Sequence, residues 1–174
     1  MTAQFGEKLY YKGCELSMGS SPLGSYFAQS GTRPDFSTSC SALWRGYTGT
    51  WEIDNGRLFL IDLNGQLNNG RLANVSTIFP HQKRVFASWY SGELLVPVGK
   101  MIKHVHMGFA SQFEEELVFT IENGKMRRIA IHRNDGAETP AETNPKERIR
   151  AVLLEKSQRK EKKRTAVQYH LLVW

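Results

Sequence analysis

Apolar and polar residues alternate along two short stretches of this chain, and an Asn-Gly pair interrupts the alternation in each of them. The first stretch covers residues 51–58 and the second covers residues 119–126, and the two align without a gap. Asn-Gly supplies the two positive-φ residues that a type I′ turn needs, so each stretch predicts a tight β-hairpin. Convergence and internal duplication explain the repetition equally well, because the matched segment is short.

The position of each turn also predicts which residues face each other across the hairpin. Directly beside each turn we expect an ion pair on one face, followed by apolar pairing on the other face. Such cross-strand pairs contribute about 0.2–1 kcal/mol each. The predicted facing pairs are Asp54 with Arg57, Ile53 with Leu58 and Trp51 with Leu60 in the first hairpin, and Glu122 with Lys125 and Ile121 with Met126 in the second.

Glycine-containing turn signals predict two further hairpins. Lys12-Gly13 separates the strand-like stretches 8–11 and 14–18, and Gly99-Lys100 separates 93–98 from 101–107. Regular short strands divided by turns are typical of an all-β architecture. The predicted fold class is therefore mainly β (α+β), an antiparallel β-barrel or sandwich built from short hairpins.

Helix and loop signals occur in the segments that connect the predicted hairpins. Ser21-Pro22 followed by apolar residues and closed by Gly31 predicts one short helix near residues 22–30. Residues 32–41 and 64–80 are expected to be loops.

The carboxyl end carries the signals of a basic C-terminal helix. Asn144, Pro145 and Glu147 supply an N-cap, a first-turn proline and a capping-box glutamate, which favours a helix from about Pro145 into a basic run. The alternative is a long hairpin in which residues 149–154 pair with 166–173. In either case the alternation of Val167, Tyr169, Leu171 and Val173 predicts that the chain ends inside the sheet.

Length and composition are those of one ordinary globular domain. With 174 residues, 40% of them hydrophobic, we expect a single domain over 1–174, with a body at 1–133, a linker at 134–144 and a basic C-terminal element at 145–174. The chain has no signal-like start and no apolar run of about 20 residues, which predicts a cytoplasmic protein without membrane contact. Cys14 and Cys40 are too few for a disulfide framework, and both are expected to be reduced, with a single structural bridge as the alternative.

The net charge of +6 is confined to one part of the chain. Residues 146–164 hold nine Lys and Arg against three Glu, whereas the remaining residues hold fourteen of each sign. The body is therefore neutral and the C-terminal element is basic. A basic segment of this kind indicates contact with an acidic or phosphate-bearing partner, although it is also common as a solvated face.

Three segments of the body are distinctive in sequence. They are residues 40–53 (Cys-Ser-Ala-Leu-Trp-Arg-Gly-Tyr-Thr-Gly-Thr-Trp-Glu-Ile), residues 86–94 (Phe-Ala-Ser-Trp-Tyr-Ser-Gly-Glu-Leu) and residues 105–108 (Val-His-Met-Gly). With these segments the chain resembles a group of small bacterial hypothetical proteins. The resemblance spans most of residues 8–126 and leaves out the chain after His132. It implies a bacterial or mobile-element origin and a β-rich body, and it transfers no functional residues.

One pair of histidines is a candidate for metal binding. His104 and His106 are separated by one residue, so both would lie on the same face of a strand, and Glu114 or Glu116 could add a carboxylate to a divalent metal. The cupin pattern is not met, because the spacings to Gly99 and Glu114 differ from it. The alternative is a half-exposed sheet face whose histidines bond to the backbone.

The basic run and nearby aromatic residues are candidates for binding nucleic acid or another partner. Lysine and arginine neutralise phosphates, and aromatic rings beside them can stack on bases. Trp89 and Tyr90 are a second aromatic pair of this kind, and the alternation of all these rings is equally typical of core residues. The candidates are Lys156, Arg159, Lys160, Lys162, Lys163 and Arg164 in the run, with Trp44, Arg45 and Tyr47 in the body.

These patterns favour a non-enzymatic, macromolecule-binding β-domain whose basic C-terminal element contributes electrostatic affinity for an unidentified protein or nucleic acid. No phosphate-binding loop ending in Gly-Lys-Ser/Thr is present, which disfavours nucleotide hydrolysis. One alternative is a metal-dependent enzyme or small-ligand pocket that uses His104 and His106, and no other cofactor is expected. Another is a structural homo-oligomer joined through strand edges or residues 167–174.

Overall fold

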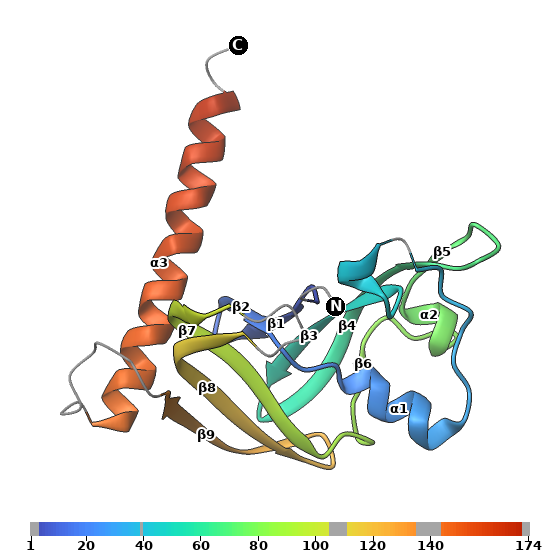
Figure 1. Cartoon of the computed structure of the whole chain (residues 1–174), viewed down its shortest axis with the longest axis horizontal. Helices are drawn as coiled ribbons and strands as arrows, with labels where there is room; N and C mark the ends of the chain where they lie inside the picture. The colour runs from blue at the N-terminus through green and yellow to red at the C-terminus, as the bar shows by residue number, and fades with distance from the viewer. Residues whose placement is uncertain (1–3, 39, 105–110, 135–143, 172–174) are drawn as a thin grey trace.

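The computed structural model describes residues 4–38, 40–104, 111–134 and 144–171, and its strands form one mixed sheet (Figure 1). Three α-helices and a single 3-10 turn, η1 (Ser41–Leu43), accompany the strands. The strands are β1 (Glu7–Tyr11), β2 (Cys14–Met18), β3 (Tyr47–Asp54), β4 (Arg57–Gln66), β5 (Leu72–Ala73), β6 (Val85–Phe86), β7 (Gly92–Lys103), β8 (Gln112–Glu122) and β9 (Lys125–Arg133). The helices are α1 (Pro22–Ser30), α2 (Val75–Ile78) and α3 (Pro145–Leu171).

Both Asn-Gly hairpins form, as β3–β4 and β8–β9, and the predicted facing pairs are confirmed. Asp54 faces Arg57 beside the first turn, and Glu122 faces Lys125 beside the second. The ion pairs, however, use other partners. The Asp54 carboxylate lies 2.9 Å from the Arg84 guanidinium, and Glu122 accepts a 2.7 Å hydrogen bond from Arg127, which the bulge in β9 places beside it.

The two Asn-Gly turns meet in space at the only pairing between β4 and β9 that the described residues show. Leu58 N donates to Gly124 O and Met126 N donates to Gly56 O, each at 2.8 Å. Each atom in the second bond is the repeat equivalent of an atom in the first. Exchanging the two copies therefore leaves the contact unchanged, which is the property of a local two-fold axis.

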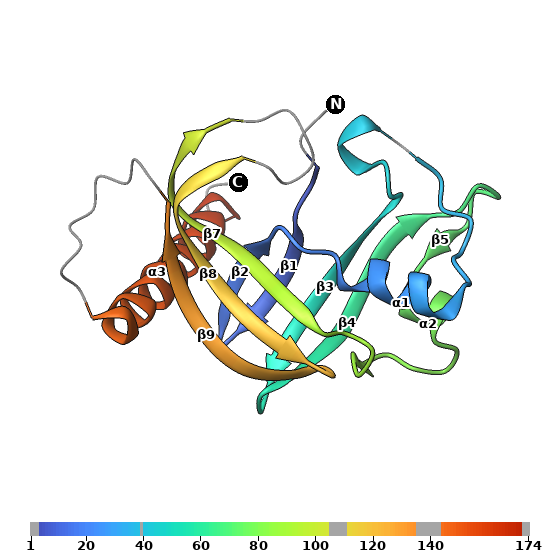
Figure 2. The same ribbon diagram turned by 60° about the horizontal axis from the view of Figure 1, so that its bottom comes forward.

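The strand order is β2-β1-β3-β4-β9-β8-β7, with β5 and β6 also paired to β4. The fold is mainly β, as predicted, but β1 and β3 run parallel, so the sheet is mixed rather than antiparallel. Strand β2 ends beside the start of β1, and the connection through α1 brings the chain back to this end of the sheet. Strand β3 therefore begins beside the start of β1 and can run parallel to it. Figure 2 shows that the sheet curls until its two edge strands, β2 and β7, approach each other.

The sheet is not closed into a barrel, and Pro97 gives a physical reason. Gly19 N donates to Leu95 O at 2.8 Å, and Leu95 N donates to Ser20 Oγ at 3.1 Å, so the backbone of Leu95 points toward β2. Residue 97 has the same orientation, because backbone groups alternate along a strand. Proline has no N–H to donate, so a β2–β7 ladder would lose a hydrogen bond at this position, which is typical of an edge strand.

The predicted hairpin at Gly99-Lys100 is wrong, because β7 is one strand that pairs with β8 on both sides of this position. The pairing register shifts between Val98 and Met101, and Gly99 adopts a φ of +79°. The Glu114 side chain accepts a 2.8 Å hydrogen bond from Lys100 N. A bulge therefore replaces the turn, because β8 is long enough to supply partners beyond it. Residues 105–107 of the predicted strand lie outside the described residues.

The short helix α1 spans Pro22–Ser30, as predicted, and Gly31 caps its end. Gly31 has a φ of 65° and donates to Phe27 O, which is a typical left-handed helix end. The expected loop at 64–80 instead contains the end of β4, strand β5 and helix α2. A capping box between Asn74 and Thr77 starts α2, and this signal was missed because Thr77 replaces the usual Glu or Gln.

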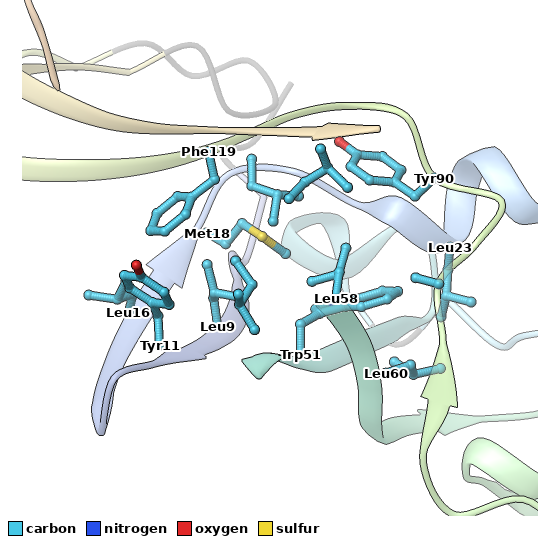
Figure 3. Close-up of a cluster of buried hydrophobic side chains, with 14 of the residues drawn as sticks. Leu9, Tyr11, Leu16, Met18, Leu23, Trp51, Leu58, Leu60, Tyr90 and Phe119 are labelled. Carbon is cyan, nitrogen blue, oxygen red and sulfur yellow. The ribbon is translucent and has the colours of Figure 1, made fainter. Parts of the chain in front are cut away.

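The main core fills the inside of the curled sheet. Trp51 and Phe119, which are equivalent positions in the two hairpin copies, are both fully buried there (Figure 3). Tyr11 packs its ring edge-to-face against Phe119, with 5.1 Å between the ring centroids. Both copies of the repeat therefore place their largest side chain in the same core.

The C-terminal segment is helix α3, and the alternative hairpin does not form. Residues 167–171 belong to this helix, so the prediction of a terminal strand is wrong for them, and residues 172–174 lie outside the described part. Figure 1 shows α3 leaving the sheet, which places its last turns too far away to pair with a strand. Within the described residues, no helix combines the length and the apolar character that crossing a bilayer demands.

Candidate functional site

Helix α3 begins with a cap that the sequence encodes locally. Lys146 N donates to the side-chain oxygen of Asn144 at 3.0 Å, and Arg148 N donates to the Asn144 carbonyl at 2.9 Å. Glu147 lies in the first turn, where a negative charge interacts favourably with the helix dipole. The start of the basic element is therefore stabilised independently of the body.

The first half of α3 docks onto the body through an apolar stripe. Val152 is fully buried and Ile149 is 9% exposed, while Leu153 packs partly buried beside them. The helix contacts β2 and β9, and the Cys14 thiol in β2 donates to Leu153 O at 3.1 Å. Ile149, Val152 and Leu153 have the spacing i, i+3, i+4, so they lie on one face of α3 and hold this face on the sheet.

A buried carboxylate adds an ionic anchor to this docking. Glu115 in β8 is 2% exposed and accepts hydrogen bonds from Arg148 Nε at 2.9 Å and Arg148 Nη2 at 2.6 Å. Arg133 Nη2 approaches the other carboxylate oxygen at 3.4 Å. Burial alone would raise the pKa of Glu115, but the hydrogen bonds and charges of the two arginines outweigh it and lower the pKa.

Sequence reasoning missed Glu115, although a signal for it existed. Residues 115, 117, 119 and 121 alternate with outward positions, so a glutamate in this series belongs to the core face of β8. A buried carboxylate requires a charged or hydrogen-bonding partner. That partner lies 33 positions away in the chain, which is why the sequence alone does not identify it.

The second half of α3 extends beyond the sheet, as Figure 1 shows. Residues 156–164 hold six basic residues and only one acidic residue, Glu161. Five of the basic residues follow the spacing i, i+3, i+4, i+7, i+8, which places their positions on one face of the helix over about 12 Å of its length. They are Lys156, Arg159, Lys160, Lys163 and Arg164, whereas Lys162 is off this face. We call these five positions the basic stripe.

The basic stripe continues the same helix face that docks onto the sheet. Residues 149, 152, 153 and 156 are spaced by three or four, and the spacing carries on into the stripe. Lys156 is partly buried at the junction, and its pKa is lowered by burial and by the neighbouring charge of Arg159. The face thus changes from apolar to basic where α3 leaves the body.

The predicted aromatic and basic group in the body does not form one surface. Trp44 is 70% exposed, but Tyr47 is buried at 2% exposure. The Arg45 side chain is drawn inward, with its Nε 3.4 Å from the Glu7 carboxylate. Trp89 and Tyr90 are likewise core residues, since Trp89 stacks on Phe79 with 5.4 Å between ring centroids and Tyr90 is 7% exposed.

Glu7 explains why Arg45 is withdrawn from the surface. Its carboxylate is 1% exposed and accepts hydrogen bonds from Trp51 Nε1 at 2.5 Å and from Ser21 Oγ at 2.9 Å. Burial raises the pKa of Glu7, although Trp51, Arg45 and Ser21 each act to lower it. This group joins β1, β3 and the start of α1 inside the fold, which indicates a structural role.

The candidate metal residues are only partly brought together. His104 and Glu116 line one cavity, whereas the Glu114 side chain is bonded to Lys100 N. His106 lies outside the described residues. Among the residues that the structure describes, no three His, Cys, Asp or Glu side chains are grouped closely enough to hold a metal ion.

Comparison of the chain with protein-family models, with curated proteins and with solved structures finds no match. The resemblance to small bacterial hypothetical proteins therefore stays a prediction.

Proposed function

We propose that this chain is a non-enzymatic binding protein that uses the basic stripe of α3 to hold a polyanionic macromolecule, with nucleic acid as the preferred class. The single observation that supports it is the division of α3 into a docked half and an extended half. The docked half is fixed by Val152 and by the Glu115–Arg148 ion pair. The extended half carries five basic positions on one face.

This arrangement suits an electrostatic ligand for two reasons. The extended half of α3 lies beyond the sheet, so its positive charge serves a partner rather than the stability of the body. The fixed base also holds the stripe in one orientation, which reduces the entropy lost on binding. Each phosphate neutralised would contribute about 0.9 to the slope of log K against log salt. Five contacts would give a slope of about −4 to −5.

The test is a fluorescence anisotropy titration of a labelled 20-base-pair DNA duplex and of an RNA duplex of equal length, from 50 to 300 mM salt. The first variant replaces all six Lys and Arg residues at 156–164 by Gln. A matched control replaces six exposed basic residues of the body by Gln, so that the net charge changes equally. Those residues are Lys8, Arg71, Lys83, Lys103, Lys125 and Arg128.

We expect the α3 variant to lose most of the affinity and of the salt slope, and the body variant to keep both. Glutamine maintains helix propensity, so the α3 variant should retain its circular dichroism. Unchanged binding by the α3 variant would refute the proposal. Equal losses in the two variants would also refute it, because they would show that total charge rather than the stripe is responsible.

A further inference from the structure

A cavity of about 220 Å³ lies where strands β2 and β7 separate. One wall comes from the end of β2 and the segment before β1, and the other comes from β7 and β8. Pro97 and Glu116 are directly paired across β7 and β8, so both lie on the face opposite the core residues Val96 and Leu117. The cavity thus lies on the outer face of β7 and β8, and it borders the main core through Met18, which is fully buried.

The walls of this cavity are mainly apolar and adaptable. Methionine side chains fill irregular spaces and make favourable contacts with aromatic rings. A dry cavity of about 150 Å³ holds a benzene molecule, so a space of this size suits one ring with a short chain. The apolar lining residues are Met18, Leu95, Pro97, Met101 and Phe113.

Glu116 places a carboxylate at the cavity that is not paired with any other described residue. Glu116 is partly buried, and within the described part of the chain its carboxylate takes part in no hydrogen bond or ion pair. Glu114, two residues away, is already bonded to Lys100 N. His132 in β9 is paired with Glu116 in β8, and His104 lines the same cavity. A carboxylate beside an apolar space favours a ligand that combines an apolar group with a positive charge.

The edge of β7 also favours a small molecule over an extended peptide as the ligand of this cavity. An extended peptide could add to the sheet here only if β7 offered a run of backbone donors. Pro97 interrupts that run at the cavity, for the reason that keeps the sheet open. A compact molecule is therefore favoured over an added strand.

We propose that the cavity between β2 and β7 binds a small organic cation, an amine carried on a single aromatic ring or a group of similar size. The ring would lie between Met18 and Met101, and the ammonium group would donate to the Glu116 carboxylate. Charge complementarity at Glu116 selects a cation over an anion of the same shape. This proposal does not rest on the basic stripe.

The test uses phenethylamine as the probe, with phenethyl alcohol as its neutral analogue and 3-phenylpropionate as its anionic analogue. Protein labelled with ¹³C at the methionine methyl groups reports binding by nuclear magnetic resonance. Assignments come from Met18→Leu and Met101→Leu. We expect the amine to shift both signals in a saturable way, the alcohol to bind about tenfold more weakly and the anion to leave them unchanged.

The decisive variant is Glu116→Gln, which keeps the shape of the side chain and removes its charge. We expect it to bind phenethylamine about tenfold more weakly and no better than the alcohol. Glu93→Gln, an exposed change on the neighbouring strand β7, is the matched control and should bind like the unaltered protein. Ser17→Phe is a second variant, which should block the cavity and abolish the shifts.

Three results would overturn the proposal. One is the absence of any saturable shift at Met18 and Met101 with the amine. The second is a Glu116→Gln variant that still prefers the amine to the alcohol. The third is binding that survives Ser17→Phe while the methionine spectrum shows an intact fold.

Discussion

Shortening Val152 to alanine tests how strongly α3 is held on the body. The side chain is 0% exposed, so the substitution removes two buried methyl groups, worth about 1.6 kcal/mol in transfer free energy. A residual cavity of about 40 Å³ adds about 1 kcal/mol. Alanine regains about 0.5 kcal/mol through its higher helix propensity. We therefore expect the free energy of unfolding to fall by about 2 kcal/mol.

The matched control is Leu154→Ala, two positions further along the same helix. This change deletes more atoms, but Leu154 is 60% exposed, so the expected loss is within about 0.5 kcal/mol. The assay is urea unfolding followed by circular dichroism for the helix and by tryptophan fluorescence for the body, which holds three of the four tryptophans, among them the buried Trp51. If α3 and the sheet unfold together, both signals shift by the same amount in Val152→Ala.

The reasoning would be refuted if Val152→Ala were no less stable than Leu154→Ala. That result would mean that the Val152 face of α3 is not packed on the sheet. If only the circular dichroism signal of the helix were lost, α3 would undock while the body stays folded.

Three further substitutions probe the two Asn-Gly turns and the ionic anchor. Gly56→Ala and Gly124→Ala both force alanine into a left-handed conformation, but only at Gly124 would the new Cβ lie 2.6 Å from a backbone oxygen, that of Ala87. Thermal and urea unfolding should show Gly124→Ala to be less stable than Gly56→Ala by about 1 kcal/mol or more, and equal stabilities would contradict the close approach of Gly124 to the Ala87 backbone. The lowered pKa of Glu115 stabilises the fold fully above its unfolded value of 4.5, and this contribution is lost as the pH falls through the folded value below it. Glu115→Gln should therefore flatten the acid limb of a stability-against-pH curve, and an unchanged acid limb would show that the Arg148 pair contributes little.

Local patterns predicted the hairpins in detail. The facing pairs at 51–60 and 119–126 follow from the turn position, because a two-residue turn leaves one register possible. The same logic failed at Gly99-Lys100. There the local signals of a turn and a bulge are alike, and the long partner strand β8 decided between them.

The candidate site was predicted in part. The basic run and its helical N-cap are visible in the sequence, and so is the spacing of the basic stripe. The alternation of residues 167–173 favoured a strand, but residues 167–171 are helical because α3 carries them away from the sheet edge. Trp44, Arg45 and Tyr47 are neighbours in sequence, yet the buried carboxylate of Glu7 draws one of them inward.

By itself, the sequence determined the strand periodicity, both Asn-Gly registers, the helix caps and the concentration of charge after residue 145, since each depends on residues a few positions apart. Only the tertiary structure decided the parallel pairing of β1 with β3, the contact between the two turns and the Glu115–Arg148 anchor. It also decided the cavity beside Glu116. These features join distant segments, and their geometry depends on how the sheet curls and where Pro97 stops it from closing.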